Sequence, residues 1–380
     1  MRILALFFHF PPMSGGGPVV SFNIVNTIAS LGHEVIVLVP DVTWNGKKYE
    51  PPMHKNLKVI RVKTPSKDNL KVAARRCAKS LKIEAERVCE KNQIDLIFTI
   101  FHPFHLVPNA AVSCAKKFGK PAIIKIDDAV YEKSHGLKSI QRRIEKYFNK
   151  KSLQGATEIL VLNEQIKKTV SDFYKIPLEK ISIMPNGIDL SFFTVKNSRE
   201  QKIVFSGVMY HHRGLETLFD AIPKIVESLP DTKVTLLGEG PEMQKLQSIA
   251  IEKRISKNVD FKGWIDRVDI PNHLSSASIA IGPLQLTPTT EKSIPVKVLE
   301  YMASSLPIIA KTGSISDNVL KDGSNGYFIQ DANELAEKAI KLLQDPALAE
   351  KMGNASRLMV QELSWENLLV SCLKKYEKNQ

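Results

Sequence analysis

The fold of this chain is decided by residues 291–310, EKSIPVKVLEYMASSLPIIA, which read as a loop, a short helix and a buried strand. We predict that the helix begins near Val296, with Lys297 in its first turn and Glu300 one turn further on. A helix N-terminus presents unsatisfied N–H groups and the positive end of its dipole, which together bind phosphate, and Lys297 adds a positive charge. Glu300 is then free to accept hydrogen bonds from a sugar hydroxyl. The alternative interpretation is an ordinary amphipathic helix that packs its apolar side chains into a core.

The pattern around this stretch predicts two α/β domains, because strand-like apolar runs alternate with helical patterns along the whole chain. A length of 380 residues also exceeds the usual size of a single core. The polar, aperiodic segment KNSREQ at 196–201 is interpreted as the linker. We therefore expect an N-terminal domain over residues 1–195, completed by a C-terminal helix at 364–380, and a C-terminal domain over residues 196–363. Both are predicted to be doubly wound and Rossmann-like, with ligands at the carboxyl ends of their strands.

Each predicted strand is a short apolar run bounded by turn residues. The predicted strands of the N-terminal domain cover residues 2–8, 34–39, 94–99, 121–126, 157–162 and 180–184. Those of the C-terminal domain cover residues 202–206, 233–237, 258–261, 278–282, 307–310 and 326–329.

Composition narrows the location and class of the protein. No apolar run approaches the ~18 residues that a membrane-spanning helix needs. The N-terminus MRILALFFHFPPM lacks a small-residue cleavage site and is interpreted as a first strand, not a signal peptide. The 4 cysteines are scattered without C-x-x-C spacing, which predicts buried thiols in a reducing compartment. These features together favour a cytoplasmic location.

Positive charge is concentrated in one part of the chain. The net charge is +13, and residues 67–151 hold 19 Lys and Arg against 9 Asp and Glu. The predicted helix 138–153 places apolar side chains such as Ile144 and Tyr147 on one face and basic residues elsewhere. This pattern is typical of peripheral contact with the anionic inner face of a membrane, and equally of a core-facing helix with a solvated basic side. Nucleic acid is disfavoured as a partner, because no aromatic platform, zinc spacing or recognition motif accompanies the charge.

A series of short blocks extends the pattern over most of the chain. The blocks are PPMSGGGPVV with LGHEV near the start, MPNGIDLSFF at 184–193, FSGVMYHHRGLETL at 205–218, LLGEGPEMQKL at 236–246, VDFKGWI at 259–265, PVKVLEYMA at 295–303 and DGSNGYFI at 322–329. In order and spacing they resemble the retaining glycosyltransferases of family 4, of the group 1 type. The resemblance runs from Met1 to about Trp365. It implies the GT-B architecture, in which two Rossmann-like domains face a central cleft and the C-terminal helix crosses back to the N-terminal domain.

Arg213 and Lys297 are the expected phosphate-binding and catalytic cations. Cleavage of a glycosyl–phosphate bond leaves negative charge on a diphosphate, and fixed cations stabilise that charge without a metal. By the resemblance, Arg213 corresponds to the family's basic residue before a glycine, here Gly214. The family usually has a second Arg after the strand glycine. This chain has Val208 there, and a neighbouring histidine or Lys297 is the candidate replacement.

Glu300, by the resemblance, is the second Glu of an E-x7-E element and binds the ribose hydroxyls of the nucleotide. The first Glu of that element falls at Lys292 in this chain, which departs from the family. The form P-x-K-x-x-E-Y-M-A of some members fits PVKVLEYMA. The other expected donor-binding residues come from the glycine loop, the strand ends and the base-reading segment: Gly16, Gly17, Gly207, Gly238, Trp264, Ile265, Pro295 and Val296. Trp264 either stacks on the base or simply packs.

The expected acceptor site lies at strand ends of the N-terminal domain. The glycines at 15–17 let the backbone approach an anion, and by the resemblance their loop closes over the donor phosphates and helps to form the acceptor site. A flexible loop is the alternative, and the absence of GxGxxG disfavours a dinucleotide fold. A carboxylate after strand 121–126 accepts a hydrogen bond from an acceptor hydroxyl or acts as general base. The expected acceptor-binding residues are Gly15, His102, Asp127 and Asp128, with Asp128 also expected to be catalytic.

These features predict an enzyme that moves a sugar from a nucleotide-diphospho-sugar, with UDP or GDP as the favoured nucleotide, to an acceptor hydroxyl with retention of configuration. By the resemblance, the acceptor belongs to a cell-envelope, capsule or exopolysaccharide glycan, with a lipid-linked acceptor among the alternatives. No cofactor is expected, and no metal, because the sequence has no D-x-D after an N-terminal strand and no His/Cys cluster at ligand spacing. The competing interpretations are a GT-B sugar epimerase and an inactive GT-B scaffold that binds sugar nucleotide or membrane. Val208 and Lys292 are the support for the inactive scaffold.

Overall fold

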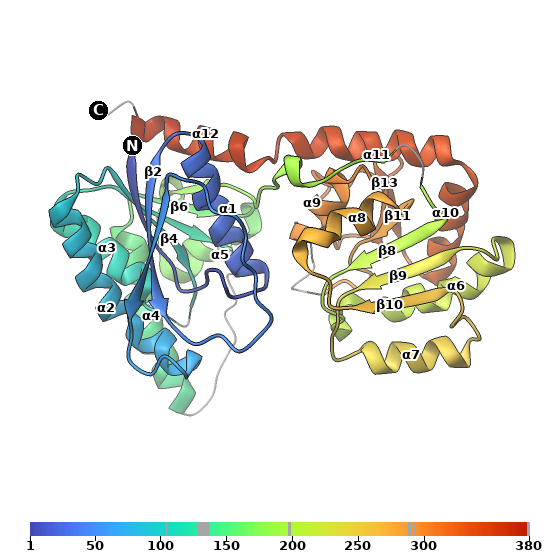
Figure 1. Ribbon diagram of the computed structural model, residues 1–380, viewed down its shortest axis with the longest axis horizontal. Helices are drawn as coiled ribbons and strands as arrows, with labels where there is room; N and C mark the ends of the chain where they lie inside the picture. Colours follow the sequence, from blue (N-terminus) through green and yellow to red (C-terminus); the bar gives the residue numbers. More distant parts are fainter. Residues whose placement is uncertain (104, 128–136, 197–198, 288–290, 292–293, 378–380) are drawn as a thin grey trace. The chain divides into compact units, whose positions relative to one another are not determined.

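The computed structural model describes the whole chain except residues 104, 128–136, 197–198, 288–290, 292–293 and 378–380. The chain divides into two compact units (Figure 1). The N-terminal unit comprises Met1–Asn186 together with Trp365–Gln380, and the C-terminal unit comprises Gly187–Ser364.

The N-terminal unit is built on a 7-stranded sheet in which all paired strands run parallel, in the order β3-β2-β1-β4-β5-β6-β7. The strands are β1 (Arg2–Leu6), β2 (Glu34–Asp41), β3 (Leu57–Lys63), β4 (Leu96–Phe101), β5 (Ala122–Ile126), β6 (Glu158–Val161) and β7 (Ile181–Ile183). The central strands β1, β4 and β5 are almost continuously apolar and buried, as expected for a parallel sheet covered on both faces.

Helices cover this sheet on both faces. They are α1 (Gly16–Ser30), α2 (Leu70–Lys91), α3 (Val107–Phe118), α4 (Leu137–Gly155), α5 (Glu164–Tyr174) and α12 (Trp365–Glu377), with a short 3-10 turn η1 (Leu178–Lys180). Helices α2, α3 and α4 pack side by side, and α1 packs against α12 (Figure 1). The C-terminal helix is fixed to this unit by polar contacts, because Tyr376 Oη donates to Glu158 Oε2 at 2.9 Å and Lys375 pairs with the same carboxylate.

The C-terminal unit is built on a 6-stranded parallel sheet in the order β10-β9-β8-β11-β12-β13. The strands are β8 (Lys202–Ser206), β9 (Lys233–Leu237), β10 (Val259–Gly263), β11 (Ile279–Ile281), β12 (Ile308–Lys311) and β13 (Gly326–Ile329). The helices are α6 (Leu215–Ser228), α7 (Met243–Glu252), α8 (Ile270–Ser275), α9 (Val296–Ala303), α10 (Ala332–Gln344) and α11 (Pro346–Gln361). Short 3-10 turns form at η2 (Leu190–Phe192), η3 (His211–Arg213) and η4 (Arg267–Asp269).

The strand order reverses once in each sheet, and this reversal positions the candidate sites. β1 lies between β2 and β4, and β8 lies between β9 and β11. At such a point the connections leave two adjacent strands toward opposite faces, and a crevice opens at the carboxyl ends, where α/β proteins bind ligands. The loops that follow Leu6 and Phe101 therefore define the candidate region of the N-terminal unit. Those that follow Ser206 and Ile281 define the candidate region of the C-terminal unit.

The division between the two units falls at Asn186, earlier in the chain than the expected domain boundary at 195. Ile188 is buried in the core of the C-terminal unit, and its N–H donates to the carbonyl oxygen of Leu363 at 3.0 Å. The segment 187–195 therefore packs with the C-terminal unit. The polar composition of the residues after it gave no indication of this long-range contact.

Strand β3 is an element that the sequence pattern did not predict. It pairs with β2 alone, at the edge of the sheet, and its sequence LKVIRVK exposes Lys58, Arg61 and Lys63. An edge strand with one solvated side carries charges at every second or third position, which breaks the continuous apolar run by which the other strands were recognised.

Helix α4 confirms the predicted helix at 138–153, but most side chains of its first two turns, including Ile144, lie outside the described part of the chain. Of its later side chains, Leu153 is buried and Tyr147 is 62% exposed. Tyr147 therefore does not pack into the core, as the core-facing interpretation of this helix required. Among the helices that the structure describes, none combines the length and apolar character needed to cross a membrane.

Candidate functional site

Two glycines at the carboxyl ends of β8 and β9 allow close packing around Lys297: Gly207 approaches the lysine itself, and Gly238 approaches Gly207. Gly207 has φ 128°, and a Cβ built there would lie 3.2 Å from Lys297 Nζ. Gly238 has φ 129°, and a Cβ there would lie 2.4 Å from the carbonyl oxygen of Gly207. Both positions need glycine, because other residues would be strained and would meet these atoms. The predicted donor residues Gly207, Gly238 and Lys297 are thus brought together.

Lys297 lies in the first turn of α9, which begins at Val296 after Pro295, as the sequence predicted. Its Nζ is buried, lies 4.0 Å from the centroid of the Phe205 ring, and has no hydrogen-bond partner among the described residues. Burial, and then the charge of Arg213, lower the pKa of Lys297 well below its ordinary value. A buried ammonium without a partner is costly, and an anion bound beside it offsets that cost.

Arg213 lies at the end of η3, and its charge acts on Lys297. Its backbone carbonyl accepts from Leu284 N–H at 3.0 Å, which ties the loop after β8 to the loop after β11. Gly214 follows with φ 67°, and a Cβ there would lie 2.9 Å from Gln285. The Nε of Arg213 is buried and has no hydrogen-bond partner in the described structure, and burial lowers the pKa of its guanidinium. Two cations thus converge on the crevice of the C-terminal unit, an arrangement suited to a diphosphate.

Glu300 lies one turn after Lys297, as predicted, but its carboxylate is not free. Its side chain is only 7% exposed, and Oε1 accepts from Arg267 Nη1 at 2.7 Å. The expectation that Glu300 is unengaged is therefore wrong for one of its two oxygens. Sequence reasoning missed Arg267. The residue carries no motif signal beyond its place just after the GWI segment.

The segment after β10 is held by acidic side chains. Trp264 N–H donates to Glu239 Oε1 at 3.2 Å, and Trp264 Nε1 donates to Asp266 Oδ1 at 3.4 Å. Trp264 is half-buried, and Ile265 packs against the apolar core of the C-terminal unit. These contacts place both residues at the carboxyl end of β10, where the base-reading segment was expected.

The N-terminal unit has its own cavity at the carboxyl ends of β1 and β4. It has a volume of ≈ 70 Å³ and is lined by Phe7, Phe8, His9, Gly17, Ser21, Ile100, Phe101, His102, His105 and Asp127. The predicted acceptor residues His102 and Asp127 meet here with Gly17. Gly15 and Gly16 lie at the exposed start of α1, and Asp128 lies outside the described residues.

Three histidines form one wall of this cavity. The ring centroids of His102 and His105 are 5.0 Å apart and stacked, and that of His9 lies 5.2 Å from His102. Burial, and then the charge of His102, lower the pKa of His9 to about 4, and burial also lowers the pKa values of the other two rings. The cluster is therefore neutral at pH 7. The sequence analysis did not select His9 or His105, because nothing local shows that loops far apart in the chain meet.

Asp127 is paired with a residue that the sequence analysis did not select. Lys125, fully buried in β5, forms an ion pair with Asp127 and also donates to Asn186 Oδ1 at 2.9 Å. The Lys125 charge compensates the Asp127 carboxylate, so that the cavity presents little net charge. A lysine inside the apolar run AIIKI was the signal that could have identified it.

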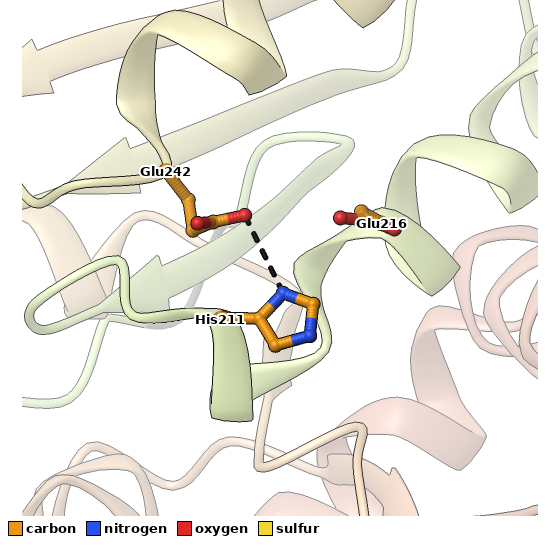
Figure 2. Close-up of side chains that lie close together, drawn as sticks. All are labelled: His211, Glu216 and Glu242. Atoms are coloured by element: carbon orange, nitrogen blue, oxygen red, sulfur yellow. Dashed lines mark ion pairs between the residues drawn. The ribbon is translucent and has the colours of Figure 1, made fainter.

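Figure 2 shows His211, Glu216 and Glu242, side chains from three different elements that lie close enough together to offer ligands to a metal. His211 Nδ1 lies 3.6 Å from Glu242 Oε2. Lys245 already forms ion pairs with both carboxylates. Spacing along the sequence does not reveal this group, and Lys245 offsets part of the negative charge of its two carboxylates.

Comparison with known proteins gives matches over nearly the whole chain. Residues 14–192 match the family described as Glycosyltransferase Family 4, and residues 188–359 match the family described as Glycosyl transferases group 1. The alpha-monoglucosyldiacylglycerol synthase of Acholeplasma laidlawii is 20% identical, over 98% of this chain and 96% of that protein.

Solved structures give the same result for the fold. Sucrose-phosphate synthase from Thermosynechococcus elongatus is 18% identical, over 100% of this chain and 99% of that chain, with a TM-score of 0.72. Anabaena HepE in complex with UDP is 13% identical, over 100% of both chains, with a TM-score of 0.71, and the same protein was also solved with UDP-glucose. These similarities confirm the predicted two-domain GT-B fold.

Proposed function

Because the chain belongs to the group 1 glycosyltransferases, enzymes that transfer sugars, we propose that its donor is a nucleotide-diphospho-sugar carrying UDP or GDP. We further propose that the sugar passes to an acceptor hydroxyl with retention of configuration. The complex of HepE with UDP-glucose supports a nucleotide-sugar donor, because that protein shares the fold over the full length of this chain.

The observation that carries the proposal is the buried Nζ of Lys297, which has no hydrogen-bond partner among the described residues and feels the charge of Arg213. A diphosphate leaving group gains negative charge as the glycosidic bond breaks, and fixed cations in a water-poor site stabilise that charge. Helix α9 begins at Val296, one residue before Lys297, and its N-terminal N–H groups are further candidate donors to the diphosphate. These groups bind and orient the diphosphate, and their charge takes the part that a metal plays in other sugar transferases.

The proposed reaction breaks the bond between the anomeric carbon and the phosphate oxygen and forms a bond from that carbon to the acceptor oxygen. Both events take place on the same face of the sugar, which preserves the configuration. The proton of the acceptor hydroxyl passes to the leaving phosphate oxygen. No pair of catalytic carboxylates of the glycosidase kind is needed for this route.

We assign the acceptor to the histidine-lined cavity of the N-terminal unit, with His102 and Asp127 as its polar contacts. Little net charge remains in this cavity, which favours the hydroxyl groups of a neutral sugar or polyol over an anion. A glycan or lipid-linked acceptor of the cell envelope fits this chemistry. The name of the Acholeplasma relative, a synthase of a glucosylated diacylglycerol, supports a lipid-linked acceptor.

The proposal is tested with purified protein and a panel of UDP, GDP, ADP and their common sugar conjugates. One nucleotide and its sugar conjugate should raise the melting temperature, since a ligand that binds the folded state alone stabilises it. That conjugate should then be hydrolysed slowly without acceptor and faster with the correct acceptor. Binding without any hydrolysis or transfer would indicate an inactive scaffold, and conversion to a sugar isomer would indicate an epimerase.

A further inference from the structure

Arg267 and Glu300 form an ion pair in the candidate donor site. The binding of ribose hydroxyls, the role expected of Glu300, does not require this pair. Arg267 Nη1 lies 2.7 Å from Glu300 Oε1, and the side chains are 22% and 7% exposed. The two residues come from different elements, η4 and α9. The guanidinium also lies 5.9 Å from the centroid of the Phe192 ring, so a second contact restrains its position.

The buried carboxylate has two cations within reach. Lys297 lies three residues earlier on the same face of α9, where residues i and i+3 are neighbours. Burial and Arg213 lower the pKa of Lys297, and the negative charge of Glu300 opposes this lowering. In the structure, however, Glu300 is hydrogen-bonded to Arg267, and Lys297 Nζ has no hydrogen-bond partner among the described residues.

The geometry of this pair decides what each group can bind. Arg267 donates a hydrogen bond to Glu300 Oε1, and its positive charge compensates the charge of this almost fully buried carboxylate. Oε2 is then held in a fixed direction as a hydrogen-bond acceptor. Because the carboxylate is drawn toward Arg267, Lys297 keeps its donors for an anion.

We propose that Arg267 is a positioning residue for the donor, which directs Glu300 to the ribose diol of a nucleoside diphosphate and keeps it away from Lys297. This inference rests on the proposed function, because it assigns a role to a residue of the same site. It makes Arg267 a determinant of selectivity for ribonucleotides over nucleotides that lack a ribose hydroxyl.

The test is a thermodynamic cycle between the side chain of Arg267 and the ribose hydroxyls. The affinities of UDP, GDP and ADP, of their 2′-deoxy and 3′-deoxy counterparts, and of pyrophosphate are measured by calorimetry on the full chain. The variants are Arg267→Gln and Arg267→Lys. Lys262→Gln is the matched control, because it breaks an exposed ion pair of the same unit, with Asp260 at 2.7 Å.

In the wild type, loss of a ribose hydroxyl should weaken the preferred nucleotide about 10- to 100-fold, the value of one hydrogen bond to a charged group. Arg267→Gln should reduce that difference in affinity to less than about threefold. It should also weaken the binding of pyrophosphate, because Glu300 then turns to Lys297. Arg267→Lys should keep part of the wild-type preference for ribose and part of the wild-type affinity for pyrophosphate. Lys262→Gln should leave both quantities unchanged.

The proposal is overturned if Arg267→Gln weakens the binding of ribonucleotides and deoxyribonucleotides equally, because a purely structural ion pair would give this result. It is also overturned if Arg267→Gln keeps wild-type affinities. Should Arg267→Gln fail to fold, Arg267→Met, which keeps the length of the side chain without its charge, replaces it and is judged by the same two outcomes. If the wild type binds none of the nucleoside diphosphates, the proposed function itself fails, whereas binding with unaltered ribose selectivity in the variants refutes the role of Arg267 alone.

Discussion

Replacement of Lys297 by methionine should affect stability and activity in opposite directions. The Nζ of Lys297 is buried, packs against the ring of Phe205 at 4.0 Å and has no hydrogen-bond partner in the described part of the chain. Methionine has a similar length and no amine, so Lys297→Met removes a buried polar group without opening a large cavity. The unliganded protein should gain about 1–3 kcal/mol in free energy of unfolding, the cost of a buried polar group that lacks a partner.

The same substitution removes a charge that we assign to the departing diphosphate. Loss of one such contact costs about 2–4 kcal/mol of transition-state stabilisation, which corresponds to a fall of about 30- to 1,000-fold in kcat/KM. A residue that served only packing would not combine a gain in stability with a loss of activity of this size.

The pH dependence gives a second signature. Burial, and then Arg213, lower the pKa of Lys297 well below 10.5 in the folded protein. Between that lowered pKa and the unfolded value of about 10.4, the unfolded chain binds a proton that the folded chain does not. The free energy of unfolding of the wild type should therefore rise with pH through this window. Lys297→Met should lack this contribution.

Thermal melts from pH 7 to 10 and steady-state transfer assays measure both effects, with Lys262→Met as an exposed control in the same unit. The reasoning is refuted if Lys297→Met destabilises the protein by more than about 1 kcal/mol, because Nζ then has a favourable partner. It is also refuted if the activity stays within about threefold of the wild type.

Four further predictions concern other parts of the molecule. Turnover should survive EDTA, because Arg213 and Lys297 supply the positive charge at the diphosphate, and a strict Mg²⁺ or Mn²⁺ requirement would contradict this assignment. Since the pKa of His9 is about 4 in the folded protein and 6.5 ordinarily, the unfolded chain gains a proton first as the pH falls. His9→Phe should therefore abolish roughly 3 kcal/mol of acid destabilisation between pH 6.5 and 4 in equilibrium unfolding, and an unchanged acid profile would show that His9 is not buried neutral. Charge reversal at Arg142 and Arg143 should release the protein from anionic liposomes and leave donor hydrolysis intact. If the wild type does not bind anionic liposomes at low salt, that result would favour the core-facing interpretation of α4. The hydrogen bond between Cys89 and Cys114, at 3.7 Å, lowers the pKa of Cys89, whereas burial raises the pKa values of Cys77 and Cys372. Mass spectrometry after limited alkylation should therefore find Cys89 modified before Cys77 and Cys372. The reverse order would contradict the contact between Cys89 and Cys114.

The sequence by itself determined the α/β class, the two-domain organisation and the elements that carry the donor site. Strands such as β4 and β8 are short, mostly apolar runs, and helix α9 begins at Val296 as predicted. These features depend on the period of apolar residues and on turn-forming glycines within a few neighbouring positions, and both are local. The positions of Gly207, Lys297 and Glu300 followed from them, because parallel strands place their carboxyl ends at one edge of the sheet.

Only the tertiary structure decided which charges meet at these edges. Arg267 and Glu300 are 33 residues apart in the chain, and Lys125 and Asn186 are 61 apart, yet each pair is hydrogen-bonded. The three histidines of the N-terminal cavity likewise come from the loops after two strands that are adjacent in space and distant in sequence. A pairing of this kind depends on strand order and on the side to which each loop turns. Local propensity holds no information on either, so burial and the partner of each charge emerge only when the sheet has formed.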